Sequence, residues 1–322
     1  MSIVNRVVDK VYVINMDSQT QRMKKVHDAL SANSIEYTRF SAVIGSKVEN
    51  SKYLSNRCNS ICTDGIKGCA LSHRKIWEEM ILNSYQSVLV LEDDIHITPD
   101  FNERFKAAWD SVPKDFDILY VGCKFICNDT NIGTFLTKIG MSDPYEKLND
   151  EINKTYGSIG THAYIITRRT AEKFLGKKIH WHIDHQIQTW IKEDSLKSYA
   201  MSSEPIQTNE EANTSSSLAE TYPKLLNSVL NKIPLSDTDS LSWSLGENHY
   251  KVFGFNWNAL SVLVFIGMLF TPFRYMWIWA LWIGAEFLAS FDTRNTTKNV
   301  FLIVLAYCFR GLIEKRKNLR LR

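Results

Sequence analysis

In the N-terminal part of the chain, apolar residues form short continuous runs separated by helix-spaced repeats. The pattern predicts a strand at residues 7–15 and a helix at 18–31, and residues 101–111 repeat apolar side chains along one helix face. A further helix is expected to end near Leu175. Three short runs rich in Val, Ile, Leu and Tyr are typical of strands buried on both faces: residues 87–91, 117–122 and 163–167. This alternation predicts an α/β domain with a mixed, mostly parallel sheet.

Beyond residue 251 the chain becomes strongly apolar. Residues 252–273 form a run of 22 without a formal charge, and residues 275–291 contain a single one, at Glu286. Four of the nine tryptophans lie in these two stretches. About 20 apolar residues span the hydrocarbon core of a bilayer, and tryptophan favours its edges. The pattern therefore predicts hydrophobic membrane-associated helices, with a buried helical subdomain or an interfacial hairpin as the alternative.

Charge is distributed unevenly along the chain. The net charge is +3, but residues 310–322 contain six basic side chains against one acid, so the rest of the chain sums to +3 − 5 = −2. A weakly acidic body argues against a nucleic-acid partner. A basic tail beside apolar helices is expected on the cytoplasmic side of a membrane. Two crossings would place the first domain there as well, and residues 1–9 contain no apolar signal-peptide core.

These patterns predict three parts. Residues 1–215 are expected to form the globular domain, and residues 216–251, which are rich in small and polar side chains, a polar linker. Residues 252–322 are expected to hold the membrane-associated helices and the basic tail.

Three consecutive carboxylates follow the expected strand at 87–91. Glu92, Asp93 and Asp94 carry like charges that repel one another. Three carboxylates at the end of a buried strand are therefore costly, which suggests that they have a function. The carboxyl edge of such a sheet is where ligands bind. Side chains alternate along a strand, so Glu92 and Asp94 would share a face and bind a hard divalent cation, Mn²⁺ or Mg²⁺, in a nucleotide site. The alternative is a solvated acidic turn before Pro99.

A second candidate segment is Gly65–Trp77, read as a turn that opens into a helix. Gly68 would allow close backbone approach, and a helix start offers free N–H groups to a phosphate. Ser72 and His73 are expected in the first turn, as donor-binding residues. The alternative for His73 is a capped surface histidine.

Further candidate chemistry lies in the segment His180-Trp-His-Ile-Asp-His185. Imidazole nitrogens suit Mn²⁺ or Zn²⁺, and His185 could complete the cation site begun by Asp94. Asp184 is a candidate general base, with Glu210 and Glu211 as rivals on a later loop. The alternative for the histidine segment is an aromatic, partly exposed loop.

Five cysteines lie in the first domain: Cys58, Cys62, Cys69, Cys123 and Cys127. The Cys-x3-Cys spacing occurs twice, but a zinc site would more typically have two-residue gaps. Free cysteines in a reducing compartment are the preferred interpretation. In an oxidising compartment, Cys58–Cys62 and Cys123–Cys127 would be disulfide candidates.

Five blocks of sequence, in order, resemble glycosyltransferase family 25, the group of lipopolysaccharide glycosyltransferases and procollagen galactosyltransferases. The family opens with a strand ending in Ile-Asn-Leu-Asp, an arginine soon after it and an Ala-x-x-Gly turn. It continues with Gly-x-x-Leu-Ser-His, Leu-Glu-Asp-Asp, Gly-x-x-Ala-Tyr and Pro-x-Asp elements. The corresponding blocks here span roughly residues 8 to 210: 11–17 with Arg22 and 40–45, 68–73, 90–94, 160–167 and 183–184.

The resemblance implies a GT-A-type, Rossmann-like fold, a divalent cation that is usually Mn²⁺, and a UDP-sugar donor that is often UDP-galactose. By this likeness Asp94 would bind the metal, and Glu92 would assist it or reach the ribose. Asp93 would hold the loop, and Asn15 and Arg22 would lie near the nucleotide. The family inverts the anomeric centre.

Two departures from the family pattern stand out. Met16 replaces a leucine, which is a mild change. The run His180-Trp181-His182 replaces the proline before Ile183-Asp184, and this departure bears on the assignment of Asp184 as a catalytic or acceptor-side residue. The expected function is transfer of a sugar to a hydroxyl on a glycan, a lipid-linked sugar or a hydroxylated protein side chain. The alternatives are an inactive sugar- or nucleotide-binding protein on the same fold, and a membrane scaffold.

Overall fold

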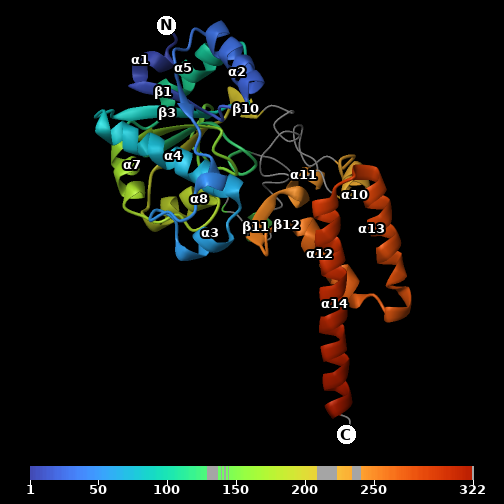
Figure 1. The fold of residues 1–322 in the computed structure, drawn as a ribbon. Coiled ribbons are helices and arrows are strands. Elements are labelled where there is room, and N and C mark those ends of the chain that lie inside the picture. The colour runs from blue at the N-terminus through green and yellow to red at the C-terminus, as the bar shows by residue number, and fades with distance from the viewer. Residues whose placement is uncertain are drawn as a thin grey trace. The chain divides into compact units, whose positions relative to one another are not determined.

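The computed structural model of the chain divides it into two compact units, residues 1–212 and 213–322 (Figure 1). The described residues are 1–128, 137–138, 140, 143, 145–208, 223–233 and 241–320, without the side chains of 243–244 and 313–320. Within the stretch expected to be a linker, 216–251, lie two short helices and the start of a strand pair. The division into three parts stays a prediction.

The helices and strands of the first unit follow one another in this order (Figure 1): α1 (Val4–Val7), β1 (Lys10–Asn15), α2 (Thr20–Ala32), β2 (Thr38–Ser41), η1 (Gly45–Lys47), α3 (Asn56–Ile61), α4 (Asp64–Leu82), β3 (Ser87–Glu92), β4 (Ile95–Ile97), α5 (Phe101–Ser111), β5 (Ile118–Gly122), β6 (Glu146–Lys147), β7 (Ile152–Lys154), β8 (Ala163–Thr167), α7 (Arg168–Leu175), α8 (Ile183–Glu193), β9 (Ser198–Met201) and β10 (Ile206–Thr208).

The centre of this unit is an eight-stranded sheet with the order β2-β1-β3-β8-β5-β9-β7-β6. Strands β2, β1 and β3 pair in parallel, as do β5 and β9, whereas β8 runs antiparallel between β3 and β5. Strand β10 pairs with β4 in a separate two-stranded ribbon. The predicted mixed, mostly parallel α/β sheet is confirmed, and the three buried runs form β3, β5 and β8.

Alternation along β8 shows why the central strands are apolar throughout. Ala163 and Ile165 pack into a core cluster that includes side chains of α2 and α5. Tyr164 points the other way and accepts a hydrogen bond from Trp77 of α4 at 3.1 Å. Helices therefore cover both faces of the sheet, and a strand between them has no solvated side.

Helix α4 starts earlier than the sequence predicted. Its N-cap is Thr63, whose side chain accepts a hydrogen bond from the backbone N–H of Ile66. Gly68 consequently lies inside the helix, and Ser72 and His73 lie in its third turn. The prediction of a phosphate-binding helix start at Gly68 is wrong, because the free amides of this helix belong to residues before it.

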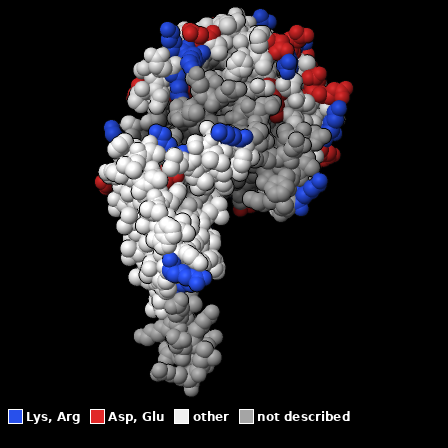
Figure 2. Space-filling model, turned by 90° about the vertical axis from the view of Figure 1, so that its right-hand side faces the viewer, with Lys and Arg blue, Asp and Glu red and all other residues white. Residues whose placement is uncertain are grey.

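The described elements of the second unit are α10 (Lys224–Leu230), α11 (Leu241–Gly246), β11 (Asn248–Val252), β12 (Phe255–Asn258), α12 (Ala259–Phe270), η2 (Phe273–Tyr275), α13 (Trp277–Ser290) and α14 (Thr293–Arg320). Helices α12, α13 and α14 enclose a small apolar cluster whose buried members are Val264, Met268, Ile283, Leu302 and Ala306. Figure 2 shows mixed charge over the first unit and a mostly uncharged surface over these helices.

Glu286, the only charge in the second apolar run, is fully buried in α13. Its carboxylate accepts hydrogen bonds from the backbone N–H groups of Leu225 and Leu226, at 3.0 and 3.3 Å. These amides belong to the first turn of α10, where a carboxylate satisfies free donors and complements the helix dipole. The charge therefore has a structural role inside this unit.

The predicted C-terminal membrane segment is wrong. Over the described residues, the structure contains no helix that is both long enough and apolar enough to cross a membrane. The uncharged run 252–273 is divided between the β11–β12 pair and α12, which ends before Thr271-Pro272. Helices α12 and α13 have 12 and 14 residues, or roughly 18 and 21 Å, against about 30 Å of hydrocarbon.

Helix α14 is longer, but its apolar stretch at 300–309 follows the polar residues 293–299. The predicted membrane anchoring by this region is therefore not supported by the described helices. The cytoplasmic placement of the first domain, which was deduced from two crossings, is not supported either. The hydropathy pattern identified the apolar residues correctly. The strand pair and the turns that interrupt these runs determine how long each helix is.

The preference for free cysteines is also wrong for four of the five cysteines in the first unit. Cys58 pairs with Cys62, and Cys123 pairs with Cys127, with Cα–Cα distances of 4.7 and 6.0 Å. Both distances lie within the range that a disulfide bridges. Cys69 is not part of a disulfide.

Candidate functional site

The predicted site residues converge at one edge of the sheet. Strands β1, β3 and β5 end at this edge, and the antiparallel strand β8 begins there. Leu91 of β3 and Gly122 of β5 both pair with Ala163 of β8, one on each side. The acidic triplet and the loop after β5 therefore emerge side by side across the start of β8.

Asp93 is fixed by two side chains from the first part of the chain. Its carboxylate accepts hydrogen bonds from Asn15 Nδ2 at 2.6 Å and from Arg22 at 2.9 Å. Asn15 is buried at the end of β1 and also accepts a bond from Arg39 Nε at 2.8 Å. Arg39 in turn pairs with Asp17. The structure thus brings together Asn15, Arg22 and Asp93, and this network anchors the turn that carries Asp94.

Glu92 belongs to a different network, on the α4 side of the sheet. Its Oε1 accepts a hydrogen bond from the hydroxyl of Thr161 at 2.6 Å and lies 3.4 Å from His73 Nε2. Burial by itself raises the pKa of Glu92, but the imidazole of His73 and the hydroxyl of Thr161 outweigh it and lower the pKa.

His73 is fully buried, so the alternative of a surface histidine is excluded. Its Nδ1 lies 2.9 Å from the hydroxyl of Tyr164, which also accepts the indole N–H of Trp77. This chain of contacts fixes the imidazole, and through it the carboxylate of Glu92. The position of His73 is that of a residue which orients Glu92 from behind.

Asp94 differs from both neighbours, because its Oδ1 is buried and has no hydrogen-bond partner in the described part of the structure. Burial, followed by the charge of Glu92, raises the pKa of Asp94 to about 7, although Arg22 and Lys124 act in the opposite direction. A carboxylate that has a buried oxygen without a donor and that repels a second carboxylate is suited to a cation.

Gly68 and Ser72 support this edge from behind. A Cβ at Gly68 would lie 2.6 Å from the carbonyl oxygen of Val43, so only glycine allows the contact between α4 and the 43–45 turn. Ser72 Oγ donates to the carbonyl of Gly68 at 2.7 Å and accepts from the backbone N–H of Val43 at 2.8 Å. Donor contact by these two residues stays a prediction.

The histidine segment lies at the start of α8. Asp184 is in its first turn, and its carboxylate accepts the backbone N–H of His185 at 2.7 Å. Burial, with a further contribution from the charge of Asp184, raises the pKa of Tyr120, which packs beside Tyr164. Asp184 is therefore near the side of the sheet that carries His73 and Glu92. The rival bases Glu210 and Glu211 lie outside the described residues.

Metal ligation can be assessed from the donor sets. Among the side chains that the structure describes, one group of three could share an ion: Cys69, His73 and Glu92, with ligand atoms within 4.8 Å of one another. Neither Asp94 nor the exposed His185 belongs to it. Mn²⁺ and Mg²⁺ prefer oxygen, so the oxygens of Glu92 and Asp94 suit these ions better than the sulfur-containing group does.

Two residues at the site were missed as site residues by the sequence reasoning. Thr161 lies in a block that was quoted only for its strand, and Lys124 follows a buried strand within a Cys-x3-Cys segment. Thr161 lies two residues before β8, and Lys124 lies two residues after β5, at the same edge as Glu92. Listing all polar residues at strand ends would have found them.

The first unit matches a known family along most of its length. Residues 8–189 match glycosyltransferase family 25, described as LPS biosynthesis protein. The chain belongs to glycosyltransferase family 25. The matched range includes Asp184 and both acid networks, and the resemblance predicted from the sequence blocks is confirmed.

Individual relatives are similar over parts of the same unit. A glycosyltransferase 25 family member of Aedes aegypti is 30% identical over 135 residues, 38% of this chain and 22% of the relative. Procollagen galactosyltransferase 2 of Homo sapiens is 23% identical over 187 residues, 52% of this chain and 27% of the relative.

A Rattus norvegicus protein named probable inactive glycosyltransferase 25 family member 3 is 28% identical over 130 residues, 36% of this chain and 23% of the relative. These three matches cover 22% to 27% of the relatives' own lengths.

Proposed function

We propose that the chain is a glycosyltransferase that moves a sugar, with galactose as the first candidate, from a UDP-sugar to a hydroxyl acceptor. Membership of the family supports glycosyl transfer, and the name of the human relative supports galactose. The acceptor class follows the same likeness: a hydroxyl on a glycan, a lipid-linked sugar or a protein side chain.

The observation that carries the proposal is the buried, unpartnered Oδ1 of Asp94 beside Glu92. Two carboxylates two positions apart, one of which has a buried oxygen without a donor, fit Mn²⁺ or Mg²⁺. When bound, such a cation would neutralise charge on the departing diphosphate.

The chain's own residues would prepare this site in three ways. Asn15 and Arg22 hold Asp93, and so fix the turn that presents Asp94. Thr161 and His73 hold Glu92 in its charged form, as the lowered pKa indicates. A preformed anionic site needs no rearrangement when the donor arrives, which is the condition for electrostatic catalysis.

Asp184 is proposed as the general base that takes the proton of the acceptor hydroxyl. Its charge acts on Tyr120, on the α4 side of the sheet that also carries Glu92. Attack on the sugar from the face opposite the diphosphate would invert the anomeric centre. Asp184→Asn should then lower transfer but leave UDP binding unchanged.

The test is release of UDP from UDP-galactose, with UDP-glucose as a second donor, measured with and without Mn²⁺. Asp94→Asn should lower the rate roughly 100-fold or more, because a metal ligand contributes several kcal/mol to leaving-group stabilisation. The matched control is Asp110→Asn, an exposed carboxylate paired with Lys106 on α5, which should retain the wild-type rate. Equal rates for both variants would disprove the cation site.

A second candidate function is that of a nucleotide-binding protein without turnover. It is suggested by the name of the rat relative, which describes that protein as probably inactive. It predicts that UDP with Mn²⁺ raises the melting temperature of the wild type but that no donor is hydrolysed. Turnover of any nucleotide sugar would exclude it.

A further inference from the structure

The loop after β5, residues 123–127, lies at the same edge as the acidic turn. Leu91 and Gly122 are separated by one strand, since both pair with Ala163. Neighbouring strands are about 4.8 Å apart, so the two backbones leave the sheet roughly 10 Å from each other. Asp94 comes three residues after Leu91, and Lys124 comes two residues after Gly122. The two residues therefore follow strand ends on either side of the start of β8.

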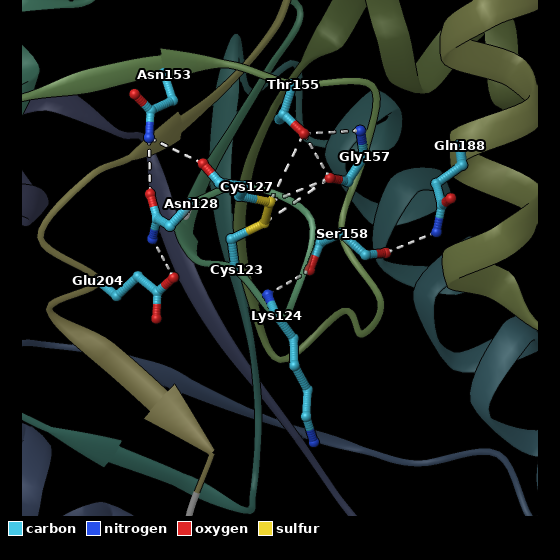
Figure 3. Close-up of a disulfide and its surroundings, with 10 residues drawn as sticks. All are labelled: Cys123, Lys124, Cys127, Asn128, Asn153, Thr155, Gly157, Ser158, Gln188 and Glu204. Carbon is cyan, nitrogen blue, oxygen red and sulfur yellow. Dashed lines mark hydrogen bonds between the residues drawn. A yellow bond between two sulfur atoms is a disulfide. The ribbon is translucent and has the colours of Figure 1, made fainter. Parts of the chain in front are cut away.

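The backbone of Lys124 is held by several contacts (Figure 3). Its N–H donates to Ser158 Oγ at 3.0 Å, and its carbonyl accepts from the backbone N–H of Ile159 at 3.2 Å. The Cys123–Cys127 disulfide closes the loop around it. Phe125 has φ 68°, a left-handed conformation that a bulky residue adopts only where its surroundings enforce it.

The contacts continue on both sides of the disulfide. On one side, Asn153 Nδ2 donates to the carbonyl of Cys127 at 2.8 Å and to Asn128 Oδ1 at 2.7 Å. On the other, Gln188 of α8 donates to the carbonyl of Ser158 at 2.9 Å. The loop is therefore fixed to β7 and, through Ser158, to α8.

The side chain of Lys124 extends away from the disulfide (Figure 3). The strand register places the backbone of Lys124 across the start of β8 from the acidic turn. Arg22 is already engaged by Asp93 at 2.9 Å. A diphosphate at this edge would meet three carboxylates, and an ammonium on a fixed backbone is the group that offsets them.

We propose that Lys124 binds the diphosphate of the nucleotide donor, and that the Cys123–Cys127 disulfide holds its backbone in place for this contact. The inference rests on the proposed function, since it needs a nucleoside diphosphate at the Asp94 edge. Lys124 then contacts the leaving group from the β5 side.

The test measures Kd for UDP and for uridine on the full chain, by calorimetry with Mn²⁺ present. Lys124→Ala should raise Kd for UDP by about tenfold or more, as expected for loss of one charge-assisted contact. Kd for uridine, which has no phosphate, should not change, and Lys124→Arg should restore most of the affinity for UDP. The matched control is Lys106→Ala, an exposed lysine of α5.

The outcomes separate the two proposals. If the wild type binds UDP and Lys124→Ala binds it equally well, the role of Lys124 is disproved but the proposed function stands. If the wild type does not bind UDP with Mn²⁺, both are overturned. Equal weakening of UDP and uridine would also overturn the phosphate contact, because a general distortion of the site would affect both.

The disulfide is tested by a double-mutant cycle. Cys123→Ser with Cys127→Ser should raise Kd for UDP in the wild-type background but add nothing in the Lys124→Ala background. An equal effect in both backgrounds would show that the disulfide does not act through Lys124. Cys58→Ser with Cys62→Ser is the matched control, since that disulfide belongs to α3. If the variant with Cys123→Ser and Cys127→Ser does not fold, the Cys123–Cys127 disulfide can instead be reduced in the variant that lacks Cys58 and Cys62. Kd for UDP is then measured before and after reduction.

Discussion

The two units treat their apolar residues differently. In the first, whole strands such as β5 and β8 are buried between helices, and large apolar side chains such as Trp77 have no exposed surface. In the second, Leu302 and Met268 are fully buried, but other side chains of the same helices face outward: Val262, Leu263, Ile266, Phe270, Trp277, Ile278, Leu281, Leu288, Val300 and Val304 are exposed.

This difference teaches what a hydropathy pattern measures. A continuous apolar run indicates that its side chains favour burial. In the first unit they are buried because helices cover both faces of the sheet. In the second unit the runs are cut by turns into helices of 12 and 14 residues, and three helices bury only one side each. The same signal therefore accompanied two unrelated structures.

The largest effect is expected from the core of the first unit. Trp77 packs against Phe174 and Trp190, with ring centroids 5.3 and 6.4 Å away, and donates to Tyr164. Trp77→Ala should lower the free energy of unfolding by about 3 to 5 kcal/mol. Calorimetric melting should show this loss in one transition only. A single transition that shifts as a whole would mean that the two units unfold as one.

The corresponding change in the second unit is Leu302→Ala, which removes a fully buried side chain from a cluster with five buried members. A loss of about 2 to 4 kcal/mol is expected, confined to the transition that Trp77→Ala leaves unchanged. Leu281→Ala serves as the control, because Leu281 is 65% exposed and its removal should alter stability by less than about 0.5 kcal/mol. Equal losses would mean that exposure does not distinguish the two positions.

A smaller effect in the second unit concerns Glu286. Glu286→Gln keeps the size of the side chain but removes the charge that accepts two N–H groups of α10. The expected cost is about 1 to 2 kcal/mol, the difference between charged and neutral hydrogen bonds. It should appear in denaturant unfolding. An unchanged midpoint would show that the carboxylate does not stabilise the start of α10.

The smallest and most specific effect depends on pH, in the first unit. Burial raises the pKa of Glu204 to about 7, although Asn128 donates a hydrogen bond to it. The folded state then binds more protons than the unfolded state between about pH 4.5 and 7, so stability falls as pH rises through this window. Glu204→Gln removes this loss and still accepts from Asn128.

Glu204→Gln should therefore stabilise the protein by on the order of 2 kcal/mol above pH 7 and have little effect near pH 4.5. Melting temperatures at the two pH values provide the measurement. A destabilised variant at pH 8 would contradict the assignment. Glu172→Gln, at an exposed position paired with Arg168, should show no such pH dependence.

Local periodicity was sufficient for the longer apolar elements of the first unit, but it did not indicate shorter ones such as α3, β4 and β9. The helix at Phe101–Ser111 and the strand at Ala163–Thr167 begin and end where the pattern predicted. The start of α4 was misplaced, because the cap at Thr63 lies in a polar stretch whereas Gly65 and Gly68 suggested a turn. Glycine is required inside this helix at Gly68 because the backbone of Val43 packs too closely to leave room for a Cβ.

The candidate site divides in the same way. The acidic triplet was visible in the sequence because three carboxylates after a buried strand are unusual, and the family blocks around it are confirmed. The partners of these acids could not be predicted from the sequence. Arg22 holds Asp93, and Thr161 and His73 hold Glu92, whereas Asp94 Oδ1 has no hydrogen-bond partner among the described residues. Those partners lie up to 71 positions apart along the chain, and only the strand order brings them to one edge.

By itself, the sequence determined the longer strands and helices of the first unit, its family and the acidic edge, because these follow from the spacing and type of residues close together in the chain. The tertiary structure decided the cysteine pairing, the burial of His73 and Glu286, and the division of the C-terminal apolar runs into short helices. Each of these depends on which distant segments pack together, and the free energy of that packing is not contained in any local pattern.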